Sequence, residues 1–491
     1  MILGLGLLIG VLADAGASRA PNVVVFLVDD LGPDELVCYA SKFHETPHID
    51  ALAAKGMRFT QAYSGATLCS PSRAALLTGR SPARMRLTDW IPGQEQINRP
   101  TVTPDWQTHM DHERVLLPEA LQEQGYATGF FGKWHLVPRV RPQDKGHPKR
   151  IAQIEARYPD HMPERHGFDE NYGGDASANQ GNRFFYPQFH SFPNLEGKGK
   201  EGSILTEVLT DCAVDFIERK KDESFLVYLS YYTVHGPVRG RPDYTKKYRR
   251  KLEDNPDAGY YMDNPEKASM MQSLDESVGR VIAKLEEAGL IDNTLIIFTG
   301  DNGSQGDEFV VNFRGNKGTA YEGGTRVPLI VVGSKIETGV SDVPTIGMDL
   351  YPTILSYVGA PLKPEEHLDG VDMMPVLDGS GAVAKRPFYW HYPHYDETTP
   401  YSSAVVDGWK VIRYADDGKT ELYHLNHDPM EKEDLAAKYP ARTSKLLANL
   451  DGYLDAVDAQ PAAANPNFDP TQFSGGIREF KALQQADRET K

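Results

Sequence analysis

The chain is poor in cysteine. Its 491 residues include three, Cys38, Cys69 and Cys212. So few thiols exclude the disulfide framework of a cysteine-rich secreted domain. Cys38 and Cys212 can pair with each other in an exported protein, or both can remain buried thiols, and the sequence leaves both alternatives open.

The chain also lacks an excess of positive charge. Its formal net charge is −17, and 40% of its residues are hydrophobic, which is typical of a folded globular protein. The acidic balance argues against nucleic acid as a ligand. An acidic enzyme repels anionic substrates at long range, so one that acts on them must gather positive charge locally.

Long apolar runs are almost absent. The exception is residues 1–12, MILGLGLLIGVL, followed by small residues as far as Ala17. This pattern predicts a signal peptide over residues 1–19, and hence export to the periplasm or beyond. No Lys or Arg precedes the run, and a buried helix is the alternative. The run is too short to favour a membrane span, so we expect no stable membrane insertion.

Five short apolar runs predict strands at residues 21–28, 127–131, 224–230, 293–299 and 327–332. Helical patterns lie between them, at residues 47–55, 117–124, 205–220 and 267–288. The alternation predicts an α/β fold with a large mixed, mostly parallel sheet sandwiched by helices. The length exceeds one ordinary core, which indicates a second, smaller domain.

The smaller domain is predicted at the C-terminus. Residues 379–387 are typical of a boundary, and short strands follow within 401–414 and 421–424, with a helix at 442–457. We expect an α+β subdomain with a short antiparallel sheet. The predicted division is a signal peptide at 1–19, a catalytic domain at 20–385 and the C-terminal subdomain at 386–491.

Charged side chains follow four of the predicted strands: Asp29 and Asp30, Lys133 and His135, His235, and Asp301 and Asn302. Ligands of such sheets gather at the carboxyl ends of the strands. Carboxylate and amide oxygens suit Ca²⁺ or Mg²⁺, and crowded carboxylates need a cation. Taken singly, each Asp pair can be a helix cap or a solvated turn, and each of the histidines can be structural.

A short helix is predicted after Cys69. Ser70 suits the N-cap, Pro71 the first turn and Gly79 the C-terminal stop. The helix start attracts anions, and Arg73 adds a positive charge beside the thiol. Considered alone, a cysteine before a helix is more simply a small buried residue.

The pattern Cys-x-Pro-Ser-Arg-x-x-x-Leu-Thr-Gly, beginning at Cys69, resembles the maturation signature of the type I sulfatases of the alkaline phosphatase superfamily. Residues 125–135 resemble the second signature of that family, and 315–328 resemble its lysine-bearing loop. Residues 21–31 and 299–303 resemble its calcium segments, and 409–435 its C-terminal subdomain. The resemblance implies an alkaline-phosphatase-like fold.

The resemblance also implies the chemistry, namely hydrolysis of sulfate esters with release of inorganic sulfate. A maturation enzyme would oxidise Cys69 to formylglycine (3-oxoalanine), whose gem-diol attacks sulfur and forms a covalent sulfo-enzyme intermediate. One Ca²⁺ would bind to Asp29, Asp30, Asp301, Asn302 and residue 69. The implied catalytic residues are Cys69, Arg73, Lys133, His135, His235, Asp301 and Lys317.

Roles follow from the same resemblance. Asp301 is the expected proton acceptor, His235 the acid for the leaving group and His135 the base in sulfate release. Lys133 and Lys317 are expected to hold the sulfate oxygens.

The substrate is a weaker inference. An exported acidic sulfatase fits a sulfated oligosaccharide or polysaccharide, and aromatic or polar residues in loops could line its pocket: Trp90, Asp175, Asn179, Arg183, His391 and His394. Ordinary packing is the alternative for these residues. A phosphate or phosphonate ester hydrolase, or a non-catalytic carbohydrate-binding protein, are the alternative functions. The sugar, the position of its sulfate and the oligomeric state stay open.

Overall fold

The computed structural model describes residues 19–94, 98–140, 152, 156–254, 264–305, 309–310, 313–396 and 398–472. The predicted signal peptide, except for Arg19, lies outside these residues. Within the described residues, no helix combines the length and the apolarity that crossing a bilayer requires.

An eight-stranded sheet forms the centre of the molecule, in the order β12-β2-β11-β8-β1-β7-β5-β6. The strands are β1 (Asn22–Val28), β2 (Met57–Phe59), β5 (Ala127–Gly132), β6 (Glu170–Tyr172), β7 (Phe225–Tyr231), β8 (Thr294–Gly300), β11 (Leu329–Val332) and β12 (Gly339–Ser341). Strands β8, β1, β7, β5 and β6 are parallel to one another. Strand β11 is shorter than the run at 327–332 and pairs antiparallel with β8 and β2. The predicted mixed, mostly parallel sheet is therefore confirmed.

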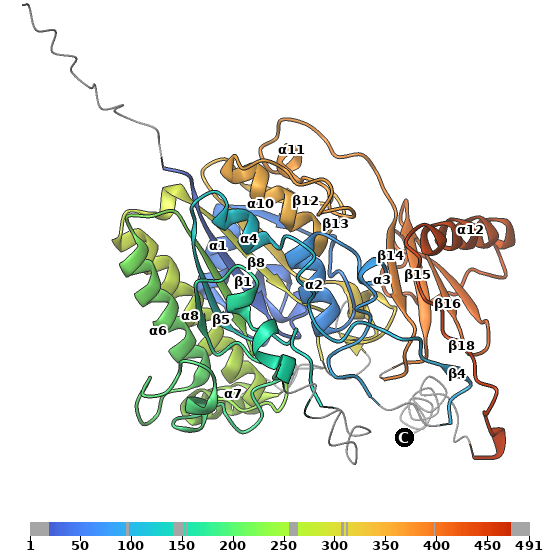
Figure 1. Cartoon of the computed structure of the whole chain (residues 1–491), viewed down its shortest axis with the longest axis horizontal. Coiled ribbons are helices and arrows are strands. Elements are labelled where there is room, and N and C mark those ends of the chain that lie inside the picture. Colours follow the sequence, from blue (N-terminus) through green and yellow to red (C-terminus); the bar gives the residue numbers. More distant parts are fainter. Residues whose placement is uncertain are drawn as a thin grey trace, which may run out of the picture.

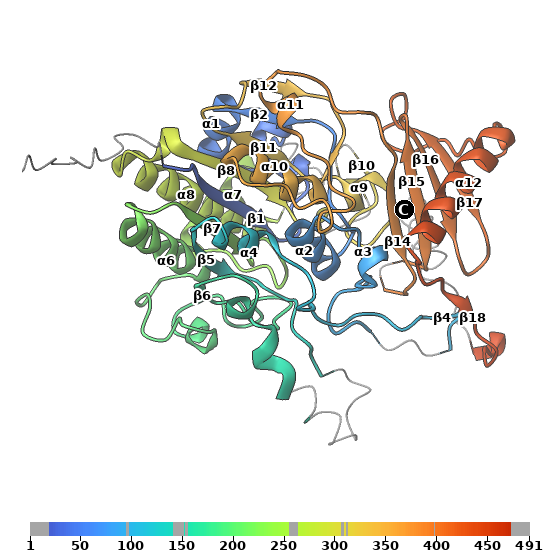
Figure 2. The ribbon, with the colours of Figure 1, turned by 45° about the horizontal axis from the view of Figure 1, so that its top comes forward.

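Helices cover both faces of this sheet (Figures 1 and 2). One face carries α1 (Pro47–Lys55), α6 (Leu205–Lys220) and α8 (Pro265–Glu287), with α7 (Pro242–Asp254) against α8. The other carries α2 (Cys69–Thr78), α4 (Leu117–Gln122) and α10 (Leu350–Val358), near the short α3 (Pro82–Met85) and α11 (Met374–Leu377). Strand β1 is buried throughout because alternate side chains enter the two cores, Phe26 on the α6 side and Val25 on the α2 side.

A second, antiparallel sheet lies at the C-terminal end of the molecule (Figure 1). It comprises β14 (Phe388–Tyr392), β15 (Tyr401–Val406), β16 (Trp409–Tyr414) and β17 (Thr420–His424), and α12 (Pro440–Ala456) packs on it through Leu446 and Leu450. The predicted antiparallel sheet is confirmed. Short elements complete the fold: β3 (Ala62–Tyr63) with β13 (Thr345–Ile346), β4 (Thr101–Val102) with β18 (Ala463–Ala464), β9 (Phe309–Val310) with β10 (Phe313–Arg314), and α9 (Glu322–Thr325).

Helix α2 begins two residues earlier than an N-cap at Ser70 predicts, and its N-cap is Leu68. The prediction for Ser70 was wrong because its hydroxyl serves two other loops. It donates to the carbonyl of His135 at 2.9 Å and accepts from the backbone N–H of Ile91 at 3.1 Å. Gly79 ends the helix as predicted, in the left-handed conformation with φ of 64°. Ser70 thus ties the start of α2 to the residues after β5.

The two remaining cysteines are separate thiols. Cys38 is half-buried, Cys212 is buried on α6, and both are free. Burial raises the pKa of Cys38 to about 12 and that of Cys212 to about 11, so neither is a ready thiolate. Of the two alternatives for these residues, the structure has the unpaired thiols.

A buried ion-pair network joins the two sheets. Lys410 on β16 is fully enclosed, and its Nζ lies 3.0 Å from Glu322 Oε1 and 3.1 Å from Glu431 Oε1. Arg326 also pairs with Glu322, at 2.5 Å. Glu322 begins α9, directly after the loop that carries Lys317. The C-terminal sheet therefore fixes the position of that loop.

We predict that Lys410→Met lowers the free energy of unfolding by about 3–5 kcal/mol, because it leaves two buried carboxylates short of a cation. Lys419→Met is the matched control: Lys419 is half exposed and pairs with Glu421 at 2.7 Å. We expect that change to cost less than about 1 kcal/mol. Urea denaturation measures both, and equal stability of the two variants would contradict the role given to Lys410.

Candidate active site

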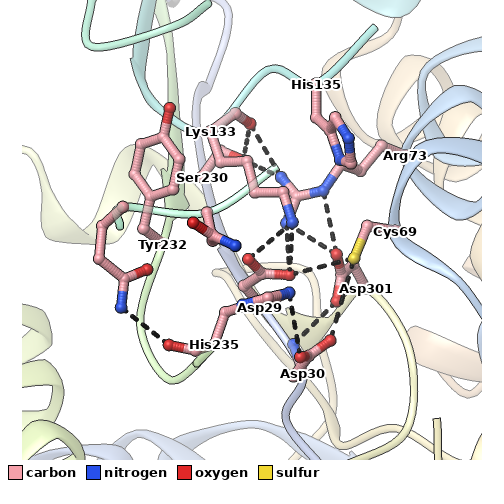
Figure 3. Close-up of polar contacts among 12 residues, drawn as sticks. Asp29, Asp30, Cys69, Arg73, Lys133, His135, Ser230, Tyr232, His235 and Asp301 are labelled. Atoms are coloured by element: carbon pink, nitrogen blue, oxygen red, sulfur yellow. Dashed lines mark hydrogen bonds and ion pairs between the residues drawn. The ribbon is translucent and has the colours of Figure 1, made fainter. Parts of the chain in front are cut away.

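Four strand ends converge at one edge of the sheet, as predicted (Figure 3). Strand β1 leads to Asp29 and Asp30, β8 to Asp301 and Asn302, β5 to Lys133 and His135, and β7 to His235. Helix α2 adds Cys69 and Arg73. The Cys69 Sγ lies 3.5 Å from Asp29 Oδ1 and 3.9 Å from Asp30 Oδ1.

Three carboxylates of this cluster each contact a different cation. The ion pairs are Asp29 Oδ2 with Lys133 Nζ at 2.8 Å, Asp30 Oδ1 with Lys317 Nζ at 2.8 Å, and Asp301 Oδ2 with Arg73 Nη2 at 2.7 Å. The carboxylates are completely buried, and the cations nearly so. An unpaired buried charge would strongly destabilise the fold, so each buried charge needs a partner of this kind. The three formal charges of each sign cancel.

The pKa values of the carboxyl groups differ because their cations balance burial to different degrees. Burial raises the pKa of Asp29 well above its usual value, and Lys133 offsets this only in part. Burial raises the pKa of Asp30 and Asp301 as well, but their neighbouring cations together outweigh it, chiefly Lys317 at Asp30 and Arg73 at Asp301, so their pKa values fall. A further cation at this place would favour the ionised form of Asp29.

The donor set fits a hard divalent cation. Asp29, Asp30 and Asp301 supply carboxylate oxygens, and the Oδ1 of Asn302 is buried without a hydrogen-bond partner among the described residues. The amide nitrogen of Asn302 is already used, since it donates to Asp30 Oδ1 at 2.7 Å. An unsatisfied buried oxygen beside three carboxylates is a natural ligand for Ca²⁺ or Mg²⁺.

His135 has a neutral ring whose two nitrogens have different surroundings. Its Nε2 lies 2.5 Å from the carbonyl of Ile91, so Nε2 carries the proton and donates it. Its Nδ1 is buried and has no hydrogen-bond partner in the described part of the chain. Burial, and then the charge of Lys133, lower the pKa of His135 well below its usual value. The ring can therefore accept a proton at Nδ1.

His235 lies on the more open side of the cluster, with 12% of its side chain exposed. Its Nδ1 lies 2.6 Å from the carbonyl of Gly236, and its Nε2 is 3.6 Å from Asp30 Oδ2. Lys317 has a similar exposure of 11%, whereas Lys133 has none. The cluster is therefore least enclosed on the side of His235 and Lys317. Burial lowers the pKa of His235, although Asp30 opposes this effect.

Two supporting residues were not predicted from the sequence. Ser230 accepts from Arg73 Nη1 at 2.6 Å and donates to the carbonyl of Lys133 at 2.7 Å. Gln180 donates to the carbonyl of His235 at 2.8 Å. Ser230 could have been noticed as a polar residue near the end of an otherwise buried strand. Nothing in the sequence marks Gln180.

Of the residues predicted to line the substrate pocket, the structure places Asp175 and Arg183 beside the site. The carbonyl of Asp175 accepts from the backbone N–H of His135 at 3.0 Å, and its carboxylate lies 3.5 Å from Arg183. Asn179 is next to Gln180, and its carbonyl accepts from Arg183 at 3.4 Å.

Trp90 adjoins Ile91, whose carbonyl accepts from His135. The Nε1 of Trp90 donates to Asp396 at 2.9 Å. His391 and His394 pack within the protein. The ring nitrogens of His391 contact Ser402 and the carbonyl of Gln460, while those of His394 face Thr88 and Asp89. For these two histidines the structure favours the packing alternative.

We predict that Ser230→Ala lowers the free energy of unfolding by about 1–3 kcal/mol, because Arg73 loses a buried charge-assisted hydrogen bond. Ser277→Ala is the matched control, since the Oγ of Ser277 is also buried but has no hydrogen-bond partner among the described residues. Chemical denaturation compares the two. Equal effects of the two substitutions would count against the role of Ser230.

Family models match most of the chain. The model "Sulfatase" matches residues 21–360, and "N-sulphoglucosamine sulphohydrolase, C-terminal" matches residues 315–460. Human arylsulfatase A is 29% identical, over 97% of this chain and 95% of its own. N-acetylgalactosamine-6-sulfatase of Canis lupus familiaris is 32% identical, over 77% of this chain and 70% of its own.

A solved structure agrees with these matches. The crystal structure of Ps i-CgsB in complex with k-i-k-neocarrahexaose has a TM-score of 0.72 and 25% identity, covering 96% of this chain and 100% of its own. The phosphonate monoester hydrolase of Agrobacterium radiobacter, with a TM-score of 0.64 and 20% identity, has the same fold. The chain therefore belongs to the sulfatase family, the type I sulfatases of the alkaline phosphatase superfamily, and is a sulfuric ester hydrolase.

Proposed function

We propose that this sulfatase removes sulfate from a sulfated oligosaccharide or polysaccharide, and that residue 69, oxidised from cysteine to formylglycine, is its nucleophile. The observation that carries the proposal is the position of Cys69. It begins α2, and its Sγ lies within 4 Å of the buried carboxylates of Asp29 and Asp30. The carbohydrate class rests on the relatives, one of which is an N-acetylgalactosamine-6-sulfatase and another of which was solved with k-i-k-neocarrahexaose.

Asp29, Asp30, Asp301 and Asn302 would hold one Ca²⁺ beside residue 69. The ion would supply Lewis acidity, which lowers the cost of forming an alkoxide and stabilises charge on sulfate oxygens. Three carboxylates and three cations cancel in this cluster. A divalent cation therefore leaves two positive charges, enough to attract an anionic ester into a protein whose net charge is −17.

Formylglycine, when hydrated, would supply a hydroxyl nucleophile and a carbon that can release sulfate by becoming an aldehyde again. Arg73 lies in the first turns of α2 and adds a permanent positive charge, because its acidic neighbours, chiefly Asp301 and Asp29, together outweigh burial and raise its pKa. Lys133 and Lys317 pair with Asp29 and Asp30. With Ca²⁺ bound to these carboxylates, the two ammonium groups would be available for the sulfate oxygens.

Three residues would move protons. Asp301 has a lowered pKa, is therefore ionised at neutral pH, and would accept the proton of the attacking hydroxyl. His235, on the open side, would protonate the leaving sugar oxygen. His135 would accept a proton at Nδ1 during release of sulfate, because Ile91 holds its other nitrogen as the donor.

The remaining inferences concern processing. We propose that residues 1–19 direct export to the periplasm or the exterior, on the basis of the apolar run at 1–12. A formylglycine-generating enzyme is the required partner. Residues 20–385 would form the catalytic domain and 386–491 the subdomain that positions the Lys317 loop through Lys410.

We predict that Cys69→Ala abolishes sulfate release from a sulfated carbohydrate while the protein remains folded, because the nucleophile is lost. Cys69→Ser should be similarly inactive, because a seryl sulfate is a stable ester without the second hydroxyl that expels sulfate from the gem-diol. Sulfate release by protein co-expressed with the maturation enzyme, and circular dichroism as the control for folding, measure both effects. Activity of Cys69→Ala close to that of the wild type, or faster turnover of a matched aryl phosphate by the wild type, would contradict the proposal.

We predict that His235→Gln lowers kcat on a carbohydrate sulfate by about 10²–10⁴-fold, the usual contribution of a general acid. The loss should be much smaller on 4-nitrophenyl sulfate, whose leaving group needs no proton. His235 acts in its protonated form, so the carbohydrate activity of the wild type should fall as pH rises through a pKa below the usual histidine value. Equal losses of kcat on both substrates would exclude His235 as the acid.

A further inference from the structure

A second cluster of titratable side chains lies next to the segment that follows β5, and the proposed mechanism does not use it. It contains His112, His161 and His166, whose potential ligand nitrogens all lie within 4.8 Å of one another. His161 ends the 3₁₀ helix η4 (Tyr158–His161), His166 follows η5 (Pro163–Arg165), and His112 lies in the loop before α4. We call this set the histidine cluster.

The ring of His166 is the poorly satisfied one of the histidine cluster. His166 is completely buried, and neither of its ring nitrogens has a hydrogen-bond partner among the described residues. Buried polar atoms are nearly always paired, so an imidazole with two unpaired nitrogens needs an explanation. A bound ion would provide one.

His161 has the tautomer that a metal ligand needs. Its Nδ1 lies 2.9 Å from the carbonyl of Met110 and so carries the donated proton. Its Nε2 is therefore left with a lone pair. Metal-binding histidines almost always donate their other N–H to a carbonyl or carboxylate in this way.

The two buried rings, His161 and His166, are kept neutral, which is the form that binds metals. Burial, followed by the neighbouring histidines, lowers the pKa of His166 to about 3, and burial lowers that of His161. His112 is exposed and stacks on His166 with a centroid distance of 4.5 Å. Since Zn–N bonds are about 2.0–2.1 Å long, the rings must draw closer together, and exposed His112 is free to turn.

We propose that His112, His161 and His166 form a binding site for a transition-metal ion such as Zn²⁺, distinct from the oxygen-rich site beside Cys69. Three imidazoles suit Zn²⁺, Ni²⁺ or Cu²⁺ and not Ca²⁺, and they leave a position for water. His109 is close, with its ring 4.3 Å from that of His161, but it is not a ligand. Its Nε2 faces the donors Arg157 and Gln107 at 3.3 and 3.2 Å.

The histidine cluster adjoins the catalytic segment. Trp134, between Lys133 and His135, donates from Nε1 to the carbonyl of His161 at 2.8 Å. Met110, whose carbonyl fixes His161, donates its backbone N–H to Leu136 at 3.0 Å. A metal ion there would fasten two loops to the residues that follow β5. We therefore expect it to stabilise the protein.

The test is a titration of the full chain with Co²⁺, after treatment with a chelator and in excess Ca²⁺, which occupies the oxygen-rich site. We expect one equivalent to give the visible absorption of nitrogen-ligated Co²⁺ and Zn²⁺ to displace it. His112→Ala, which changes an exposed residue, should weaken Co²⁺ binding at least about tenfold. His109→Ala is the matched control and should leave the affinity unchanged.

A second readout is thermal unfolding. Zn²⁺ should raise the Tm of the wild type and of His109→Ala but not that of His112→Ala. Absence of a Co²⁺ band in the wild type, or an affinity that is the same in His112→Ala, would overturn the proposal. Either result would leave the sulfatase reaction untouched, because that reaction depends on none of these histidines.

Discussion

The structure depends on a balance of buried charge. Three carboxylates sit at the carboxyl ends of neighbouring parallel strands, where water cannot reach them, and three cations neutralise them. Each cation comes from a different part of the chain: Arg73 from α2, Lys133 from the end of β5, and Lys317 from the loop before α9. Removal of any one partner would leave a buried charge uncompensated, so the charge balance and the fold require each other.

This balance of charge requires that the C-terminal sheet hold the loop that carries Lys317. The Lys317 loop begins on the large sheet's side of the molecule, yet Glu322 at its end is held by Lys410 of the C-terminal sheet. Two serines position the other two cations, Arg73 and Lys133. Ser70 joins α2 to the segment after β5, and Ser230 accepts a hydrogen bond from Arg73. The site is thus built by contacts between elements that are distant in sequence.

Much of this could be predicted from the sequence. Buried strands and amphipathic helices have local patterns, and the polar residues after strands predicted the convergence of Asp29, Lys133, His235 and Asp301. The rest needed three-dimensional information. Ser70 looks like an N-cap until its partners Ile91 and His135 are known. The direction of β11, the packing of His391 and the grouping of His112 with His166 depend on tertiary contacts that have no local signal.

We infer that the neutral charge cluster becomes a receptor for sulfate only when it holds a divalent cation. The most direct measurement is calorimetric titration of the Cys69→Ala protein with inorganic sulfate, once with saturating Ca²⁺ and once with a chelator. We predict tighter sulfate binding with Ca²⁺, by about 5–150-fold, the usual range for coupled sites. Equal sulfate affinity under the two conditions would contradict it.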